Sequence, residues 1–476
     1  MRAILTAVAV LGLTTSAAAD TILVPRDFDS IQKAVDAAAP FDTVVVSRGV
    51  YEENVVVGTA NLTLVGAGAI VDGTLGAPPT TDGICIEVVV SDVTIRGFSF
   101  RNGLRHVNAS GDRIQVLQCV SRDASEAGIL IAGNDALVDR CRVLGSDGIG
   151  ILVNGNNAVV KRCQVRQGVD SGISVLSLQG TVESCVVSNI LIGIGVNASG
   201  DGLSVLRNRV TDCSSGISSI GVGATVQSNR VRHTVGAALF SDGDGAVLER
   251  NLVADCNAGL RCLGDGVRVL SNRVSGILGG SGLEVSGDDV TVQRNRVAGC
   301  ITGAAFRIVS ASVAGGGLVE ENIAQDGGNY GLVLSTTSAV VRKLLVLRCG
   351  SGAFAGLAVD GTLNTVEDVI VKEADPTGVQ VDGDDNTIRR CFVSDSGADG
   401  FRVLAGSNNS FEDCVSLRNG GEGLDNGGMG TTLDGGVYLQ NRIDIANRTG
   451  DGATIVGGLA SVDFGTGGVS TEPEVD

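Results

Sequence analysis

The chain has 476 residues, a formal net charge of −18, 43% hydrophobic residues and 70 glycines. The acidic balance argues against nucleic acid and anionic membrane surfaces as partners, and the apolar fraction is too high for a disordered chain. The glycines show neither the G-X-Y period of collagen nor the tandem GGxGxD nonapeptides of calcium-binding repeats.

Residues 1–19 are predicted to be a signal peptide. Arg2 supplies a charged start, an apolar run follows to Leu13, and Ala17-Ala18-Ala19 resembles a cleavage site. A buried N-terminal helix is the alternative interpretation. We therefore expect a mature chain that begins at Asp20 and is secreted or periplasmic. The apolar run is too short to span a bilayer and no later segment is apolar enough, so no membrane insertion is expected.

Residues 20–58 are predicted to form an N-terminal cap and the first strands. A short amphipathic helix is expected between a capping Ser30 and Pro40, because its apolar residues recur at helical spacing: Ile31, Ala34, Val35 and Ala38. This helix would cover the open edge of the first strands, which would otherwise invite aggregation.

Residues 59–460 carry a repeat whose most regular mark holds Cys or Asn, as in "VDRCRV" and "VQRNRV". The mark recurs every 21 to 27 residues, at Cys119, Cys141, Cys163, Cys185, Asn208, Asn229, Asn251, Asn272, Asn295, Asn322, Leu344, Val369, Cys391 and Cys414. A second mark, Gly followed by an apolar residue, recurs at the same interval. Clusters of Gly, Asn and Asp, which are typical of turns, lie between the marks. A unit this small cannot bury its own apolar face, so the pattern predicts stacked coils of two or three short strands, a parallel β-solenoid.

The Cys/Asn mark is interpreted as a packing position. An inward residue at a tight bend must be small or must satisfy backbone groups, and stacked Asn side chains can bond the turn and each other. Four more cysteines follow the mark by five residues in alternate coils: Cys213, Cys256, Cys300 and Cys349. Their axial spacing exceeds disulfide reach, and stacked neighbours have parallel Cβ vectors, so mostly buried thiols are expected.

The runs "SIQKAVDAAAP", "DTVVVSRGVYEENVVV", "LTLVGAGAIVDG" and "VTIRGFSFRNG", with the later "NRV" coils, resemble pectin-lyase-like right-handed β-helix proteins. The resemblance implies an all-β, right-handed parallel β-helix with a short N-terminal capping helix. Polysaccharide lyases, polygalacturonases, methylesterases, epimerases and non-catalytic surface proteins share this fold. The hydrolase motifs Asn-Thr-Asp and Gly-His-Gly and the epimerase motif Asp-Pro-His-Asp are missing, and "SVDFGTGG" lies in the C-terminal end and acidic tail at 461–476.

One candidate catalytic site lies four residues after the repeat mark. There His233 falls between Asp212 and Asp255 on adjacent coils, with outward Arg209 and Arg230 nearby. Such a histidine could abstract a proton beside a uronate whose carboxylate the arginines hold. The alternative is a row of ordinary turn residues.

A second candidate is an aspartate-rich edge that could hold calcium through oxygen ligands, at Asp242, Asp244, Asp265, Asp288 and Asp289. Each also sits in a Gly/Asp turn, which is the alternative reason for its presence. The other histidine, His106, lies in a basic stretch and is expected to be a packed residue rather than a base.

The sequence therefore predicts a protein that binds or processes an extracellular acidic polysaccharide, with lyase or epimerase chemistry if it is catalytic. The alternative is a non-catalytic structural or adhesive rod. The chain has no Trp and only three Tyr, which leaves few aromatic platforms for a sugar cleft.

Overall fold

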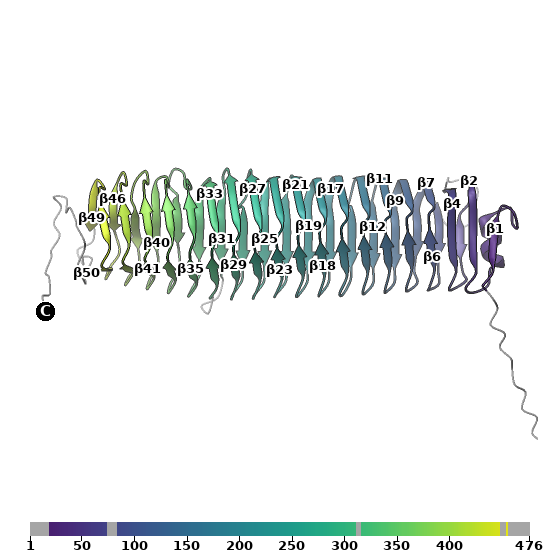
Figure 1. Ribbon diagram of the computed structural model, residues 1–476, viewed down its shortest axis with the longest axis horizontal. Coiled ribbons are helices and arrows are strands. Elements are labelled where there is room, and N and C mark those ends of the chain that lie inside the picture. Colours follow the sequence, from purple (N-terminus) through teal and green to yellow (C-terminus); the bar gives the residue numbers. More distant parts are fainter. Residues whose placement is uncertain (1–18, 74–82, 311–315, 448–453, 456–476) are drawn as a thin grey trace, which may run out of the picture.

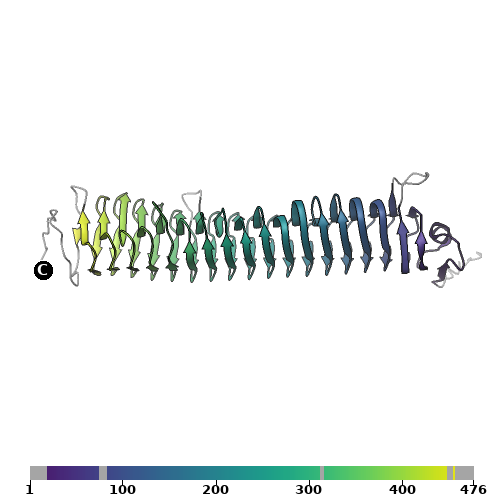
Figure 2. The same cartoon turned by 90° about the horizontal axis from the view of Figure 1, so that it is seen from above.

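The computed structural model describes residues 19–73, 83–310, 316–447 and 454–455, which form a long rod of stacked coils (Figures 1 and 2). Residues 1–18 of the predicted signal peptide and the "SVDFGTGG" segment lie outside the described residues. At the N-terminal end, helix α1 (Ile31–Ala37) begins after Ser30, whose hydroxyl accepts a hydrogen bond from the Lys33 amide. Its apolar stripe is buried at the end of the rod, as the sequence predicts.

Each coil passes through three flat faces. The first-face strands end two residues before the repeat mark, and β2 and β4 continue onto the second face. The first face comprises β1 (Thr21–Val24), β2 (Thr43–Tyr51), β4 (Thr63–Asp72), β6 (Thr94–Arg96), β8 (Gln115–Leu117), β10 (Leu137–Asp139), β13 (Val159–Lys161), β16 (Thr181–Glu183), β18 (Ser204–Leu206), β20 (Thr225–Gln227), β23 (Val247–Glu249), β26 (Arg268–Leu270), β29 (Thr291–Gln293), β32 (Leu318–Glu320), β35 (Val340–Arg342), β38 (Thr365–Glu367), β41 (Thr387–Arg389), β44 (Ser410–Glu412), β47 (Thr432–Asp434) and β50 (Thr454–Ile455).

The second-face strands begin one residue after the mark. They are β7 (Ser99–Ala109), β9 (Val120–Ala132), β11 (Arg142–Ser146), β14 (Gln164–Gly168), β17 (Val186–Ser199), β19 (Arg209–Ile220), β21 (Arg230–Thr234), β24 (Leu252–Cys256), β27 (Arg273–Ile277), β30 (Arg296–Cys300), β33 (Ile323–Gly327), β36 (Leu345–Leu347), β39 (Ile370–Lys372), β42 (Phe392–Ser394), β45 (Val415–Leu417) and β48 (Val437–Leu439). Four of them, β7, β9, β17 and β19, continue onto the third face.

The third face closes the coil. Its other strands are β3 (Val55–Val57), β5 (Ile84–Val88), β12 (Ile149–Asn154), β15 (Ile173–Leu176), β22 (Ala237–Asp242), β25 (Ala258–Leu263), β28 (Leu283–Ser286), β31 (Ala304–Val309), β34 (Tyr330–Ser335), β37 (Ala355–Val359), β40 (Thr377–Asp382), β43 (Phe401–Ala405), β46 (Glu422–Asn426) and β49 (Ile443–Asn447). The strands pair in parallel with those of neighbouring coils, as in β21 with β24, and the inward residues form one continuous apolar core. The predicted all-β parallel β-helix is confirmed.

The repeat mark is a buried ladder, as predicted. The amide nitrogen of the Asn251 side chain donates to Val226 O at 2.9 Å and to Asn272 Oδ1 at 3.0 Å. These bonds satisfy polar groups that burial would otherwise leave without partners. A second ladder of Asn364, Asn386 and Asn409 lies at the preceding corner of the C-terminal coils, where the sequence shows only turn clusters.

Cysteine fills the same ladder in the N-terminal coils. The Cys163 thiol donates weakly to Lys161 O at 3.3 Å and is 1% exposed. All twelve cysteines are buried and none forms a disulfide, which confirms the expectation of buried thiols. Burial raises the pKa of the Cys213 thiol to about 11, so this thiol is neutral near neutral pH.

The Gly-apolar mark is also explained by packing. A Cβ atom at Gly150 would lie 2.5 Å from Val165 Cγ1 and 2.6 Å from the carbonyl oxygen of Gly172 on the next coil. Only glycine allows the backbone of one coil to approach its neighbour this closely. Neither regular mark of the sequence is therefore a catalytic motif.

Candidate functional site

His233 lies at the outward corner that follows the second face, between Asp212 and Asp255 of the adjacent coils. Its Nδ1 is 3.3 Å from Asp212 Oδ1 and its Nε2 is 3.9 Å from Asp255 Oδ2. All three residues adopt left-handed backbone conformations with φ between 52° and 57°, which turn their side chains away from the core. The predicted neighbourhood is therefore present and accessible, with 55% of the His233 side chain exposed.

The same corner carries charge pairs in other coils. Arg348 donates to Asp326 at 2.7 Å, and Arg418 donates to Asp395 at 2.9 Å, each pair joining adjacent coils. The neighbouring guanidinium groups lower the pKa of both carboxyls. A polar or charged residue at this corner can therefore serve to hold coils together, which is the turn interpretation that the sequence left open.

Arg209 and Arg230 are paired in register on strands β19 and β21 and point outward. They belong to a larger surface, which we call the arginine face: the outward side chains of the second-face strands from β9 to β30. The first and third residues of each strand point outward, and eight of them are exposed arginines: Arg122, Arg142, Arg166, Arg209, Arg230, Arg232, Arg273 and Arg296.

The arginine face has no internal counter-charge. None of its outward positions holds Asp or Glu, and none of its eight guanidinium groups has a carboxylate partner among the residues that the structure describes. Adjacent arginines such as Arg209 and Arg230 lie one coil apart, where two unit charges repel by about 1 kcal/mol in water. A bound anion would remove this repulsion.

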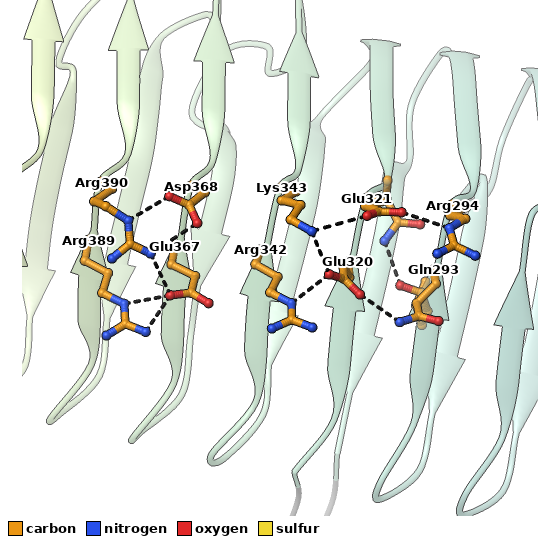
Figure 3. Close-up of polar contacts among 12 residues, drawn as sticks. Gln293, Arg294, Glu320, Glu321, Arg342, Lys343, Glu367, Asp368, Arg389 and Arg390 are labelled. Atoms are coloured by element: carbon orange, nitrogen blue, oxygen red, sulfur yellow. Dashed lines mark hydrogen bonds and ion pairs between the residues drawn. The ribbon is translucent and has the colours of Figure 1, made fainter.

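At the corner between the first and second faces, unlike on the arginine face, the cations form ion pairs with carboxylates. Figure 3 shows acidic and basic residues alternating from coil to coil along this corner. Lys343 bridges Glu320 at 3.2 Å and Glu321 at 3.3 Å, while Arg390 donates to Asp368 at 2.8 Å. The hydrogen bond from Arg390 lowers the pKa of the Asp368 carboxyl. We call this set the paired ladder, because its charges neutralise one another: Gln293, Arg294, Glu320, Glu321, Arg342, Lys343, Glu367, Asp368, Arg389 and Arg390.

The candidate calcium ligands fall into different rows. Asp244, Asp265 and Asp288 stack in one row, where Asp244 Oδ1 accepts the Asp265 amide at 2.9 Å and Asp265 Oδ1 accepts the Asp288 amide at 2.8 Å. Asp242 is the last residue of strand β22. Asp289 directly follows Asp288 in the chain and adopts a left-handed conformation with φ 51°. These contacts are what turn aspartates make, and the calcium site itself stays a prediction.

A group of buried carboxylates in the C-terminal coils was not found from the sequence. Asp399, Glu422 and Asp425 are 5%, 5% and 2% exposed, and their ligand oxygens lie within 4.8 Å of one another. Arg402 lies 4.0 Å from Asp399 and 3.5 Å from Asp425, and Arg442 pairs with Glu422. Burial, followed by the hydrogen bond with Glu422, raises the pKa of Asp399 to about 6. The available signal was an acidic residue before the glycine in two successive repeats, Asp399-Gly400 and Glu422-Gly423.

His106 is fully buried, and its Nδ1 lies 2.6 Å from the Ser121 hydroxyl. Burial lowers the pKa of the imidazole to about 4, so the ring is neutral near neutral pH. This confirms that His106 is packed in the core. A shallow depression of about 330 Å³ on the third face is lined by residues that include Leu130, Leu152 and the ion pair of Arg105 with Glu126.

Among the residues that the structure describes, no helix is long and apolar enough to cross a membrane. No curated protein matches the sequence. The fold is similar to the A-module of the mannuronan C-5 epimerase AlgE6 from Azotobacter vinelandii, at 13% identity over 86% of this chain and 93% of that one, with a TM-score of 0.30. It is similar to the PL6 family alginate lyase AlyGC at 10% identity over 92% and 98%, with a TM-score of 0.36. A tailspike protein of the E. coli bacteriophage HK620 matches at 12% identity over 80% and 73%, with a TM-score of 0.41.

At these identities and TM-scores the similarity says nothing about activity. The family assignment comes from the sequence instead. The model of the right-handed β-helix region matches residues 79–205, 192–346 and 351–458, which together cover most of the chain. The pectin-lyase-like resemblance of the repeats is thus confirmed, and the chain belongs to the right-handed β-helix family.

Proposed function

We propose that this protein binds an acidic polysaccharide along the arginine face. The observation that carries the proposal is a pair of adjacent rows that together hold eight exposed arginines without carboxylate partners among the described residues, on a chain whose net charge is −18. The planar guanidinium group offers paired donors that match a carboxylate or sulfate in a fork-to-fork geometry. The overall acidic charge would at the same time disfavour less specific binding to polyanions.

His233 gives the second candidate function, lyase or epimerase chemistry on a uronate. A neutral imidazole at this corner could take the proton next to the uronate carboxylate. Arg209 and Arg230 would stabilise the negative charge that then develops on that carboxylate, and Asp212 would orient the ring. Loss of the neighbouring glycosidic oxygen gives an unsaturated sugar, whereas return of a proton to the opposite side gives the epimer. The observation behind this proposal is the pair of contacts from His233 to Asp212 and Asp255.

Export and calcium belong to the same proposal. An acidic polysaccharide substrate would be met outside the cytoplasm, which agrees with the signal peptide expected at residues 1–19. Calcium held through oxygen ligands by Asp242, Asp244, Asp265, Asp288 and Asp289 would be a separate site, because these residues lie at the corner between the third and first faces and not beside the arginine face.

The test is to titrate the protein with polygalacturonate, alginate and a glycosaminoglycan, with neutral dextran as the control polysaccharide, in the presence of calcium or of a chelator. We expect binding to the acidic polymers only, weakened by salt because exposed charges are screened. The variant R209Q/R230Q should weaken binding roughly tenfold, since each exposed charge pair contributes up to about 1 kcal/mol. R26Q/K33Q removes the same charge from exposed sites outside the arginine face and should bind normally. Equal binding by both variants, or none by the parent protein, would instead favour the non-catalytic rod.

A further inference from the structure

We infer that the bound polysaccharide lies lengthwise along the rod axis, across the nine coils from β9 to β30, and carries a charged group on nearly every sugar. This inference rests on the proposed function and specifies its substrate class: a linear, uniformly charged polyanion rather than a neutral chain with occasional acidic sugars. It makes the arginine face one extended site rather than a local pocket.

The register of the strands supplies the first argument. The first outward row contains Arg142, Arg209, Arg230, Arg273 and Arg296, and Arg209 with Arg230 and Arg273 with Arg296 are direct partners in the parallel pairing. The third-residue row adds Arg122, Arg166 and Arg232. At the ~4.8 Å spacing of parallel strands, the rows from β9 to β30 extend for about 38 Å.

The distribution of charge supplies the second argument. Seven of the nine strands carry at least one of these arginines, and only β17 and β24 carry none. A ligand with one or two charges would leave most of the guanidinium groups repelling each other without a counter-ion. A polyanion that runs along the axis meets a cation at almost every coil, whereas one that runs across the face meets only one or two strands.

The end of the arginine rows supplies the third argument. From β33 onward the same outward positions become mainly aliphatic or aromatic, including Ile323, Leu345, Leu347, Ile370 and Phe392, and Gln325 on β33 accepts a hydrogen bond from Arg296. The one cation in these later rows, Lys372, lies over the Phe392 ring at 5.4 Å from its centre. Beyond β30 the described part of the face therefore carries a single cation, Lys372, three coils away, so the continuous site should end at Arg296.

The experiment measures the affinity of the full chain for size-fractionated oligogalacturonates, from the disaccharide upward, by calorimetry. We expect affinity to rise with length until the oligomer spans about 38 Å and then to level off. Two variants remove arginines from opposite ends of the face: R142Q/R166Q and R273Q/R296Q. Each should weaken the binding of long oligomers roughly tenfold but that of short oligomers less than about threefold, because a short oligomer can occupy the intact end.

The outcomes separate the two proposals. Affinity that does not depend on length, or that falls equally at all lengths in only one of the two variants, would overturn the lengthwise mode while leaving polysaccharide binding in place. Absence of binding by the parent protein to any acidic polymer would overturn the proposed function and this inference together. R26Q/K33Q again serves as the charge-matched control, and unchanged thermal unfolding of each variant shows that the coils are intact.

Discussion

The second face carries different side chains in the two halves of the rod, although the backbone repeats without a break. From β9 to β30 its outward positions hold eight arginines that have no carboxylate partner among the described residues. From β33 to β48 the same positions are mainly aliphatic, and most cations of these coils lie elsewhere and pair with carboxylates, as with Arg389 and Arg390 against Glu367.

The difference shows how one scaffold can use arginine in two ways. In the C-terminal half a cation bonds the carboxylate one coil away and so contributes to the cohesion of the rod. In the N-terminal half some cations are paired in the same way, as with Arg162 and Asp139, but the eight arginines of the arginine face have no carboxylate partner among the described residues and remain available to a ligand. Because the parallel register is the same in both halves, the distinction arises from the placement of acidic residues and not from the backbone.

The largest expected effect concerns His233, which lies at the edge of the arginine face. If lyase chemistry occurs there, H233N should reduce the formation of unsaturated uronate ends at least about 10²-fold, because general bases typically contribute that much or more. Asparagine tolerates the left-handed conformation that His233 adopts at φ 52°, so the coil should stay folded. Ultraviolet absorbance of the double bond measures the rate.

Gln167 provides the matched control, since it occupies the same exposed left-handed corner three coils earlier. Q167N should leave the rate unchanged. Double-bond formation that survives in H233N would move the chemistry to another site on the rod while leaving the arginine face as the binding surface.

An intermediate effect is expected for the paired ladder. E367Q removes the charge that holds both Arg389 and Arg390, and the Glu367 side chain is only 11% exposed. Removing the buried partner of two half-exposed arginines leaves their charge uncompensated, so we expect the free energy of unfolding to fall by about 1 to 2 kcal/mol, less than for a fully buried pair. Chemical denaturation measures this, with E52Q, at an exposed site, as the control.

The same variant tests the comparison between the two halves. Affinity for the polyanion should not fall in E367Q, because Arg389 and Arg390 lie outside the arginine face. If E367Q instead binds more tightly than the parent protein, the arginines that it releases also accept the ligand, and the division between the two halves would be wrong.

Much of the fold could be predicted because the coil repeats its constraints. Each ladder residue must fit the same buried corner, so Cys163 and Asn251 mark the same position through different contacts. The register then places His233 beside Asp212 by counting residues alone. The sequence could also have shown that the outward rows around Arg209 contain no Asp or Glu. This becomes visible only when the residues of each strand are divided into inward and outward positions.

The arrangement of the candidate acidic sites could not be predicted, because it depends on the exact turn geometry and on burial, and no local sequence pattern indicates either. Asp242 and Asp289 are near Asp244 and Asp288 in the sequence, yet a shift of one or two residues within a turn moves a side chain into another row. Asp399 and Glu422 are the opposite case, because they appear as surface turn residues in the sequence but lie almost completely buried. Their ionisation is set by packing from other coils, which the sequence around them does not indicate.

The smallest expected effect follows from that burial. The pKa of Asp399 is raised to about 6, above its ordinary value of 3.8, first by burial and then by Glu422. The folded state therefore binds a proton that the unfolded state has already lost. The resulting stability is fully present below about pH 4 and disappears as the pH rises through about 6. Between about pH 4.5 and pH 6.5 the loss should be about 1 to 2 kcal/mol.

D399N keeps the shape of the side chain and removes its titration, so the difference in unfolding free energy between D399N and the parent protein should change with pH across this window. Acidic groups whose pKa is lowered, such as Asp368 and Glu321, change stability in the opposite direction at lower pH, but they are common to both proteins and cancel in the difference. A difference that stays constant with pH would mean that Asp399 remains ionised beside Arg402. Polyanion affinity should be the same in both proteins, because the carboxylate cluster lies on the C-terminal coils and the arginine face ends at Arg296.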